Sequence, residues 1–300
     1  MRRNFCSFGG MIRFFNILLP VFLVCSCSIS RFLKGPDTSD IMALEGEGTV
    51  EAVTYVPTEE DLSQRRMIVY LPPSYSVETG RSYPVMYLIH GARGNEITWN
   101  ERANSFEVLD SLRAAGEAEE FILVQVNMNN YWGELDYQDG RPITMTRAFL
   151  FEDGEAEENF FTDVVERVDS MYRTIPSKEG RAIAGMSMGG FQSLYMAANH
   201  PDAFNHIGLF SSFLYPMPAA LGHMDVYGNL WDKLEILFQD PPATFNIYIG
   251  KNDIFYLQSI MFDQRLTEYG YPHNYVVTDG GHTWENWKKY LIDFYKVSFR

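Results

Sequence analysis

The sequence predicts an α/β fold with a mostly parallel central sheet, an antiparallel N-terminal edge and helices on both faces. Three observations lead to this prediction. Apolar runs of strand length alternate with helical stretches along most of the chain. The runs 84–91 and 121–126 are almost continuously apolar, as expected of strands that helices cover on both faces. The stretches 49–56 and 65–71 alternate polar and apolar residues around a polar turn, which is typical of an antiparallel pair at a sheet edge.

The other elements follow from the same patterns. Short β-rich or apolar runs predict further strands at 181–184, 207–211, 245–250 and 273–277. Longer stretches with helical periodicity predict helices at 105–115, 160–172, 191–199, 257–269 and 284–294. Two stretches, Asn129–Asn159 and Ser212–Asp240, have no clean periodicity and carry several aromatic residues. Because irregular loops at the carboxyl edge of a parallel sheet often carry function, we expect Asn129–Asn159 to form a substrate wall, with a decorative insertion as the alternative.

The length and charge of the chain narrow its class. It has 300 residues, 46% of them hydrophobic, which is enough for one buried core. Its formal net charge of −15 would repel nucleic-acid phosphates, so we expect no nucleic-acid partner. All three cysteines lie at or before Cys27. The rest of the chain is therefore predicted to contain no disulfide, no thiolate metal site and no cysteine nucleophile.

The first 27 residues have the pattern of a lipoprotein-type signal peptide. Basic residues precede the apolar run 14–25, which is too short to span a membrane comfortably. Cys27 follows a small residue, as in a bacterial lipobox, so we expect lipidation there; an ordinary cleaved signal peptide and an uncleaved anchor are the alternatives. Residues 28–44 are predicted to form a tether and 45–300 the folded domain. This organisation predicts attachment to a bacterial cell envelope, in the periplasm or at the outer membrane, or secretion.

The stretch Gly185–Gly189 is a G-x-S-x-G motif between a predicted strand and a predicted helix. In that context the serine, Ser187, sits on a sharp turn that exposes its hydroxyl at the edge of the sheet. Glycines are needed on either side because a Cβ would collide with the strand or the helix. The N–H of Met188, at the start of the helix, would face a developing negative charge. A Gly-Ser turn without chemistry is the alternative for this motif alone.

Two later strands are followed by an acid and a base. Asp253 follows one strand and His282, preceded by two glycines, follows the next. Because the carboxyl ends of parallel strands meet at one edge, we expect Asp253 and His282 beside Ser187. His282 would accept the serine proton and Asp253 would orient the imidazole, in the chain order of an α/β-hydrolase. The competing acids are Asp225, Asp263 and Asp279, and the histidines expected to pack or lie on the surface are His200, His206, His223 and His273.

The loop after the first buried strand should supply a second donor to the oxyanion. His90 is expected to shape this loop, and the donor would be the N–H of Gly91 or of Ala92. The sequence leaves open which of these two amides points inward.

Five motifs carry a resemblance to a known family. They are Tyr87–Gly91, Gly94-Asn95 with Trp99, Ala184–Gly190, Gly250–Asp253, and Gly281–Trp284 with Trp287. The chain resembles the "Putative esterase" family of α/β-hydrolases over about residues 50–295. This family includes feruloyl, acetyl-xylan, enterochelin and tributyrin-type esterases, S-formylglutathione hydrolases and mycolyltransferases. The resemblance implies Ser187 as nucleophile, Asp253 as orienting acid, His282 as base, a carboxylic ester substrate, and no cofactor or metal.

The resemblance and the leader together predict a secreted or envelope-tethered serine carboxylesterase that acts through an acyl-enzyme. Its expected substrates are acetyl or feruloyl esters of plant polysaccharides. Aromatic side chains suit sugar or phenolic rings, and the predicted substrate contacts are Tyr131, Trp132, Tyr215 and Trp284. The alternatives are a siderophore esterase of the enterochelin type, an acyltransferase, or a catalytically silent carbohydrate-binding protein of the envelope.

Overall fold

The computed structural model describes residue 44 and the ranges 46–58, 65–92, 94–128, 137–138, 141–142, 154–215 and 224–300. The chain divides into two compact units, of which Met1–Asp37 lies outside the described residues and Thr38–Arg300 contains all of them. The predicted signal peptide, the lipidation site Cys27 and the tether up to residue 43 therefore also lie outside. Within the described ranges, no helix combines the length and the apolar character needed to cross a membrane.

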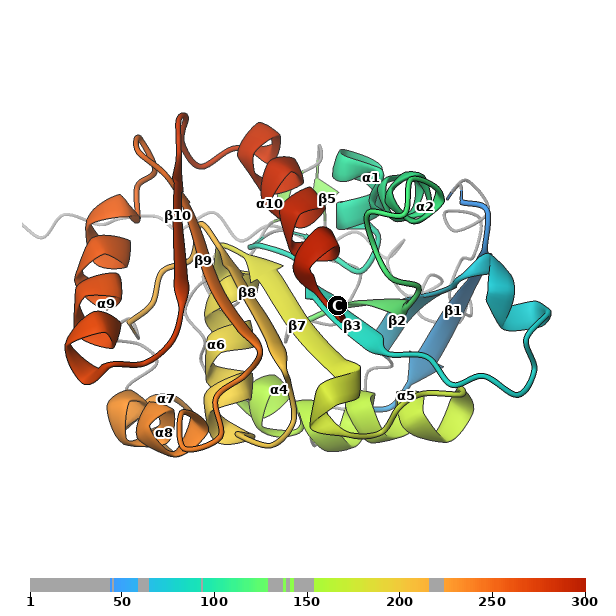
Figure 1. The fold of residues 1–300 in the computed structure, drawn as a ribbon, viewed down its shortest axis with the longest axis horizontal. Helices are drawn as coiled ribbons and strands as arrows, with labels where there is room; N and C mark the ends of the chain where they lie inside the picture. Colours follow the sequence, from blue (N-terminus) through green and yellow to red (C-terminus); the bar gives the residue numbers. More distant parts are fainter. Residues whose placement is uncertain are drawn as a thin grey trace, which may run out of the picture. The chain divides into compact units, whose positions relative to one another are not determined.

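Eight strands form one sheet in the order β1-β2-β4-β3-β7-β8-β9-β10 (Figure 1). Their bounds are β1 Thr49–Tyr55, β2 Arg65–Leu71, β3 Val85–Ile89, β4 Ile122–Val126, β7 Arg181–Met186, β8 His206–Phe210, β9 Thr244–Gly250 and β10 Asn274–Thr278. Strand β2 pairs antiparallel with both β1 and β4, and the remaining pairs of this sheet are parallel. The predicted α/β architecture with an antiparallel edge is confirmed. Two short strands, β5 Tyr137–Gln138 and β6 Arg141–Pro142, pair separately.

Helices cover both faces of the sheet. One face carries α1 Thr98–Ala103, α2 Ser105–Ala114 and α10 Trp284–Val297. The helices associated with the other face are α4 Glu155–Glu158, α5 Glu166–Met171, α6 Met188–Asn199, α7 Met224–Tyr227, α8 Leu230–Leu237 and α9 Tyr256–Tyr269 (Figure 1). Two short 3₁₀ turns, η2 Pro73–Ser76 and η4 Lys178–Gly180, and one π-helical turn, η3 Phe161–Val165, complete the described elements.

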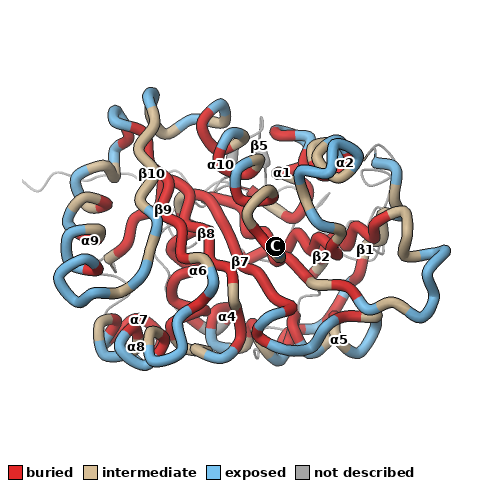
Figure 2. Tube along the Cα trace, in the orientation of Figure 1, coloured by how far each residue is buried: buried red, intermediate tan, exposed pale blue. Residues whose placement is uncertain are grey.

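The core consists of two apolar clusters, one on each face of the sheet. In β3, Val85, Tyr87 and Ile89 join one cluster, whereas Met86 and Leu88 join the other. Successive side chains of a strand point to opposite faces, so an apolar run without alternation marks a strand that is covered twice. Figure 2 shows the result, because the central strands are buried along almost their whole length.

Three local predictions were wrong. The single α-helix expected at 160–172 begins instead with the π-helical turn η3 and continues as α5, and α4 precedes it. The stretch Ser212–Asp240, expected to be irregular, contains α7 and α8, and helix α1 was not predicted at all. Helices α1, α7 and α8 have only four to eight residues, too few for a helical period to stand out from chance.

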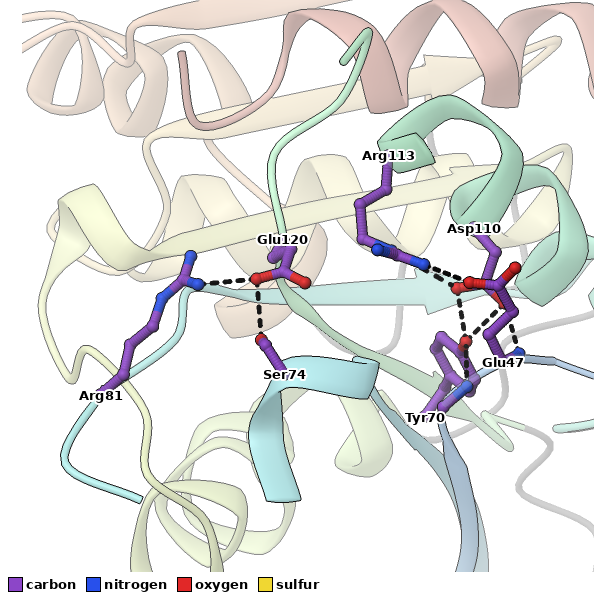
Figure 3. Close-up of polar contacts among 8 residues, drawn as sticks. Glu47, Tyr70, Ser74, Arg81, Asp110, Arg113 and Glu120 are labelled. Carbon is purple, nitrogen blue, oxygen red and sulfur yellow. Dashed lines mark hydrogen bonds and ion pairs between the residues drawn. The ribbon is translucent and has the colours of Figure 1, made fainter. Parts of the chain in front are cut away.

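Polar contacts hold the start of the described chain to α2 (Figure 3). The Tyr70 hydroxyl donates to the Asp110 carboxylate at 2.6 Å and accepts from the N–H of Gly48 at 2.8 Å. The N–H of Glu47 donates to the same carboxylate at 2.7 Å, and the Glu47 side chain pairs with Arg113. Burial raises the pKa of Tyr70, so its hydroxyl remains a donor. A second group in the figure joins Ser74 and Arg81 to Glu120.

The strand register shows at which end of the sheet the chain enters β1. Thr49 pairs with Leu71, and Tyr70 pairs with Leu123 near the start of β4. Strand β4 runs parallel to β3, which is parallel to β7. The chain therefore joins the sheet at the amino end of the parallel strands.

Candidate active site

Ser187 occupies a strained turn between β7 and α6. Its φ of 54° and ψ of −115° are unusual for a residue with a side chain. A Cβ on Gly185 would lie 2.4 Å from the backbone of Gly189, and a Cβ on Gly189 would lie 2.4 Å from the carbonyl oxygen of His90. The N–H of Ser187 donates to the carbonyl of Phe210 at 2.8 Å. The glycines thus permit a close approach of strand and helix, which fixes the serine at the carboxyl edge of the sheet.

The structure brings Ser187, His282 and Asp253 into one line of hydrogen bonds. Nε2 of His282 lies 3.0 Å from Oγ of Ser187, and Nδ1 lies 3.1 and 3.2 Å from the Asp253 carboxylate oxygens. A carboxylate only accepts, so Nδ1 carries the proton and Nε2 is free to accept from the serine hydroxyl. Burial alone would raise the pKa of Asp253, but the hydrogen bonds from His282 and from the N–H of Phe255 lower it below its usual value. The acid therefore stays ionised beside the imidazole.

Several contacts hold the imidazole of His282 in place. Its ring lies between Phe255, at 5.3 Å between centroids, and Trp287, at 4.9 Å, and is nearly perpendicular to both. The Asn286 side chain donates to the carbonyl of Gly281 at 3.1 Å, which anchors the loop just before the histidine. Sequence reasoning missed Phe255 and Asn286 as supports of the site. The position of Asn286 in the first turn of the helix after His282 was the available signal for it.

The loop after β3 lies against this turn. A Cβ on Gly91 would contact Met186 at 3.4 Å, so the loop abuts the residue that precedes Ser187. The carbonyl of Gly91 accepts from the N–H of Gly94 at 3.0 Å. In the described ranges, no acceptor is paired with the N–H of Ala92. Met188 is the first residue of α6, where an N–H has no acceptor within the helix. Neither amide therefore has a recorded acceptor among the described residues.

Of the four predicted substrate contacts, the structure describes two, and these two pack against different aromatic residues. Trp284 packs at right angles against Trp99 and Trp287, with ring centroids 5.4 and 5.1 Å away. Tyr215 is half-buried and meets Phe262 edge to face. Tyr131 and Trp132 lie outside the described residues. A substrate role for the four residues stays a prediction.

The competing acids and histidines have other partners or settings. Asp263 pairs with His273 at 3.0 Å, and Asp279 forms an exposed ion pair with Lys251. The others are placed as follows: Asp225 is exposed on α7, His200 stacks on Phe161, His206 contacts Thr244, and His223 lies outside the described residues. Across the described ranges, no three His, Cys, Asp or Glu side chains are grouped to hold a metal ion.

Comparison with known sequences gives one family. The family described as "Putative esterase" matches residues 62–296. An endo-1,4-beta-xylanase/feruloyl esterase of Xylanibacter ruminicola is 27% identical over 249 residues, which are 81% of this chain and 30% of that protein. An esterase of Mycobacterium tuberculosis is 25% identical over 71% of this chain and 51% of its own length. The chain thus spans about a third to a half of these relatives.

Solved structures agree with the sequence comparison. A ferulic acid esterase is 26% identical, with a TM-score of 0.68 over 84% of this chain and 98% of its own. The S-formylglutathione hydrolase of Staphylococcus aureus shares the fold at 15% identity, with a TM-score of 0.63 over 85% of this chain and 98% of its own. The ferulic acid esterase of Anaeromyces mucronatus, solved with ferulic acid, shares it at 19% identity, with a TM-score of 0.65 over 84% and 91%.

Proposed function

Because this chain belongs to the "Putative esterase" family, we propose that it is a serine carboxylesterase in which Ser187, His282 and Asp253 form the catalytic triad. The observation that carries the proposal is the unbroken line of hydrogen bonds from the serine oxygen to the buried carboxylate. A binding role would not require a serine in a strained backbone conformation with a base 3.0 Å away.

The chemistry follows from the proton positions. His282 accepts the proton of Ser187 at Nε2 as the serine oxygen attacks the ester carbonyl. The imidazolium then gives this proton to the departing alcohol, which leaves an acyl-enzyme. In the second half of the reaction, His282 accepts a proton from water as the water attacks the acyl group. The imidazolium then returns the proton to the serine oxygen, which releases the acid product and restores Ser187. Asp253 stays charged throughout and stabilises the imidazolium.

The N–H groups of Met188 and Ala92 would stabilise the negative charge on the carbonyl oxygen. In a trans peptide, the N–H points away from the C=O. The carbonyl of His90 faces Gly189 at the start of α6, so the N–H of Gly91 points away from that helix. Ala92 is therefore the better of the two predicted donors. Loss of one such donor typically lowers the rate by ~10²–10³.

The proposed substrates are acetyl or feruloyl esters of plant polysaccharides. Support comes from the relative named a xylanase and feruloyl esterase and from the ferulic acid esterase structure. The aromatic residues Tyr131, Trp132, Tyr215 and Trp284 are proposed to contact the sugar or the phenolic ring.

Active-site labelling and a substrate panel test the proposal together. Ser187→Ala should abolish both hydrolysis and the fluorophosphonate adduct with an unchanged melting temperature. Ser170→Ala, a change at an exposed serine of α5, should keep both. The panel compares feruloyl, acetyl-xylan and short nitrophenyl esters with siderophore lactones and with an added acceptor alcohol. Hydrolysis of lactones alone, or acyl transfer in place of hydrolysis, would replace the substrate proposal. A folded wild type without an adduct would favour a carbohydrate-binding protein.

We also propose that Cys27 is lipidated and anchors the protein to a bacterial envelope. The support is the small residue before Cys27 and the basic and apolar stretches that precede it. Growth with an alkyne-tagged palmitate should label the protein, and Cys27→Ala should remove the label. Cys25→Ala serves as the matched control and should keep it. Equal labelling of the two variants would contradict the assignment.

A further inference from the structure

His90 is a buried imidazole next to the proposed oxyanion donors. Only 1% of the residue is exposed, and both ring nitrogens have partners. Nε2 lies 3.0 Å from the backbone nitrogen of Met128, and Nδ1 lies 2.8 Å from the carbonyl oxygen of Gly91. The ring therefore bridges the end of β4 and the loop after β3.

These partners determine the tautomer. The N–H of Met128 can only donate, so Nε2 accepts and carries no proton. The carbonyl of Gly91 can only accept, so the proton is on Nδ1. Burial lowers the pKa of His90, which keeps the ring in this neutral form.

The bond to Gly91 determines the direction of the next amide. The carbonyl of Gly91 and the N–H of Ala92 belong to one planar peptide and point in opposite directions. The carbonyl of Gly91 accepts both from Nδ1 of His90 and from the N–H of Gly94, and while these bonds hold it the N–H of Ala92 keeps the opposite direction. A Cβ on Gly94 would lie 2.9 Å from Cβ of His90, so the loop closes tightly around the ring.

We propose that His90 is a positioning residue whose Nδ1–H bond to Gly91 orients the Ala92 amide toward the ester oxygen in the transition state. The inference rests on the proposed esterase function and extends it to a residue that does not touch the substrate.

Buried polar contacts hold the other end of the bridge. Asn127, next to Met128, donates from its side chain to Glu96 at 2.8 Å, and Glu96 also accepts from Arg66. Asn127 and Glu96 are 8% and 5% exposed. Water rarely competes for such buried contacts, so the Met128 amide that supports His90 is itself held in place.

Two substitutions separate the two bonds of the ring. In His90→Asn, the side-chain amide reaches the position of Nδ1 and can donate to Gly91, but nothing accepts from Met128. In His90→Gln, the amide oxygen reaches the position of Nε2 and can accept from Met128, but the side chain no longer donates to Gly91, whose carbonyl keeps only the bond from the N–H of Gly94. Each variant loses one buried hydrogen bond, so their melting temperatures should fall by similar amounts.

The kinetics should differ. For His90→Gln we expect kcat to fall about 10- to 100-fold with KM nearly unchanged, since a misplaced donor acts on the transition state. The affinity for a trifluoromethyl ketone, which forms a tetrahedral adduct, should fall in parallel. His90→Asn should keep both values within about threefold of the wild type, because it keeps the donor on which the oxyanion amide depends.

Equal losses of kcat in the two variants, or a larger loss in His90→Asn, would overturn the proposal. If either variant fails to fold, ¹⁵N NMR of histidine-labelled wild type decides, because a proton on Nε2 of His90 would also overturn it. Fluorophosphonate labelling keeps this test separate from that of the proposed function. A folded wild type without an adduct on Ser187 refutes the esterase itself, whereas a reactive wild type with equal variants refutes only the role of His90.

Discussion

Mild acid should destabilise the protein through His206. This residue of β8 is 3% exposed, its Nδ1 lies 3.0 Å from the Thr244 hydroxyl, and its Nε2 accepts from the N–H of Phe299. Burial lowers the pKa of His206 from 6.5 to about 4. Between these two values the unfolded chain binds a proton that the folded chain does not. The free energy of unfolding is therefore unaffected by His206 above about pH 6.5 and falls as the pH drops toward 4.

The size of the effect follows from the two pKa values. A difference of about 2.5, at about 1.36 kcal/mol for each pKa unit, gives a limit of about 3.4 kcal/mol. The loss should be about 1.4 kcal/mol at about pH 5.5 and about 2.6 kcal/mol at about pH 4.5. Because a folded domain is stable by only ~5–15 kcal/mol, this loss is readily measured.

Urea unfolding of the wild type and of His206→Gln isolates this contribution. The glutamine can still accept from the N–H of Phe299 but does not titrate. Carboxylates and the other buried histidines titrate in both proteins, so they cancel in the difference between the two free energies. We expect this difference to change by about 1.4 kcal/mol between about pH 7.5 and 5.5, to the disadvantage of the wild type. A difference that stays constant over this range would refute the reasoning.

Three further predictions concern the turn, the acid and the edge of the sheet. Gly185→Ala should abolish soluble expression or lower the melting temperature sharply because its Cβ would lie 2.4 Å from helix backbone, whereas Gly80→Ala, with open space around it, should behave as wild type in the same assay. Asp253→Asn should lower kcat by ~10⁴ at neutral pH because the amide no longer selects the required imidazole tautomer, and a loss below tenfold would contradict the triad. Tyr70→Phe should cost about 1–3 kcal/mol in urea unfolding because the buried Asp110 loses the hydroxyl donor and the N–H of Gly48 loses its acceptor, and an unchanged midpoint would argue against these bonds.

The succession of strands along the chain and the residues at their carboxyl ends could be predicted from the sequence, whereas the order of the strands within the sheet was not predicted. The sheet is buried on both faces, so its strands appear as continuous apolar runs such as 84–91, and the polar residue after each run marks the edge. Asp253 and His282 were expected beside Ser187 because the carboxyl ends of parallel strands meet at one edge of the sheet. Their separation along the chain played no part in this expectation.

The supports of the site could not be predicted in the same way. The tautomer of His90 depends on an amide that is 38 residues away, at Met128. The placement of His282 depends on the ring of Phe255, which has no pattern of its own in the sequence. Such contacts depend on distances between loops, whereas periodicity reports only which side of an element faces the core.

The pairing of Thr49 with Leu71 has a consequence for access to the site. Ser187 lies at the carboxyl end of β7, and the chain joins the sheet at the opposite end, where Glu47 is held to α2. Whatever is attached ahead of this point begins on the far side of the domain from the nucleophile. A bulky substrate that reaches Ser187 therefore meets the end of the sheet opposite to the one at which Glu47 is held.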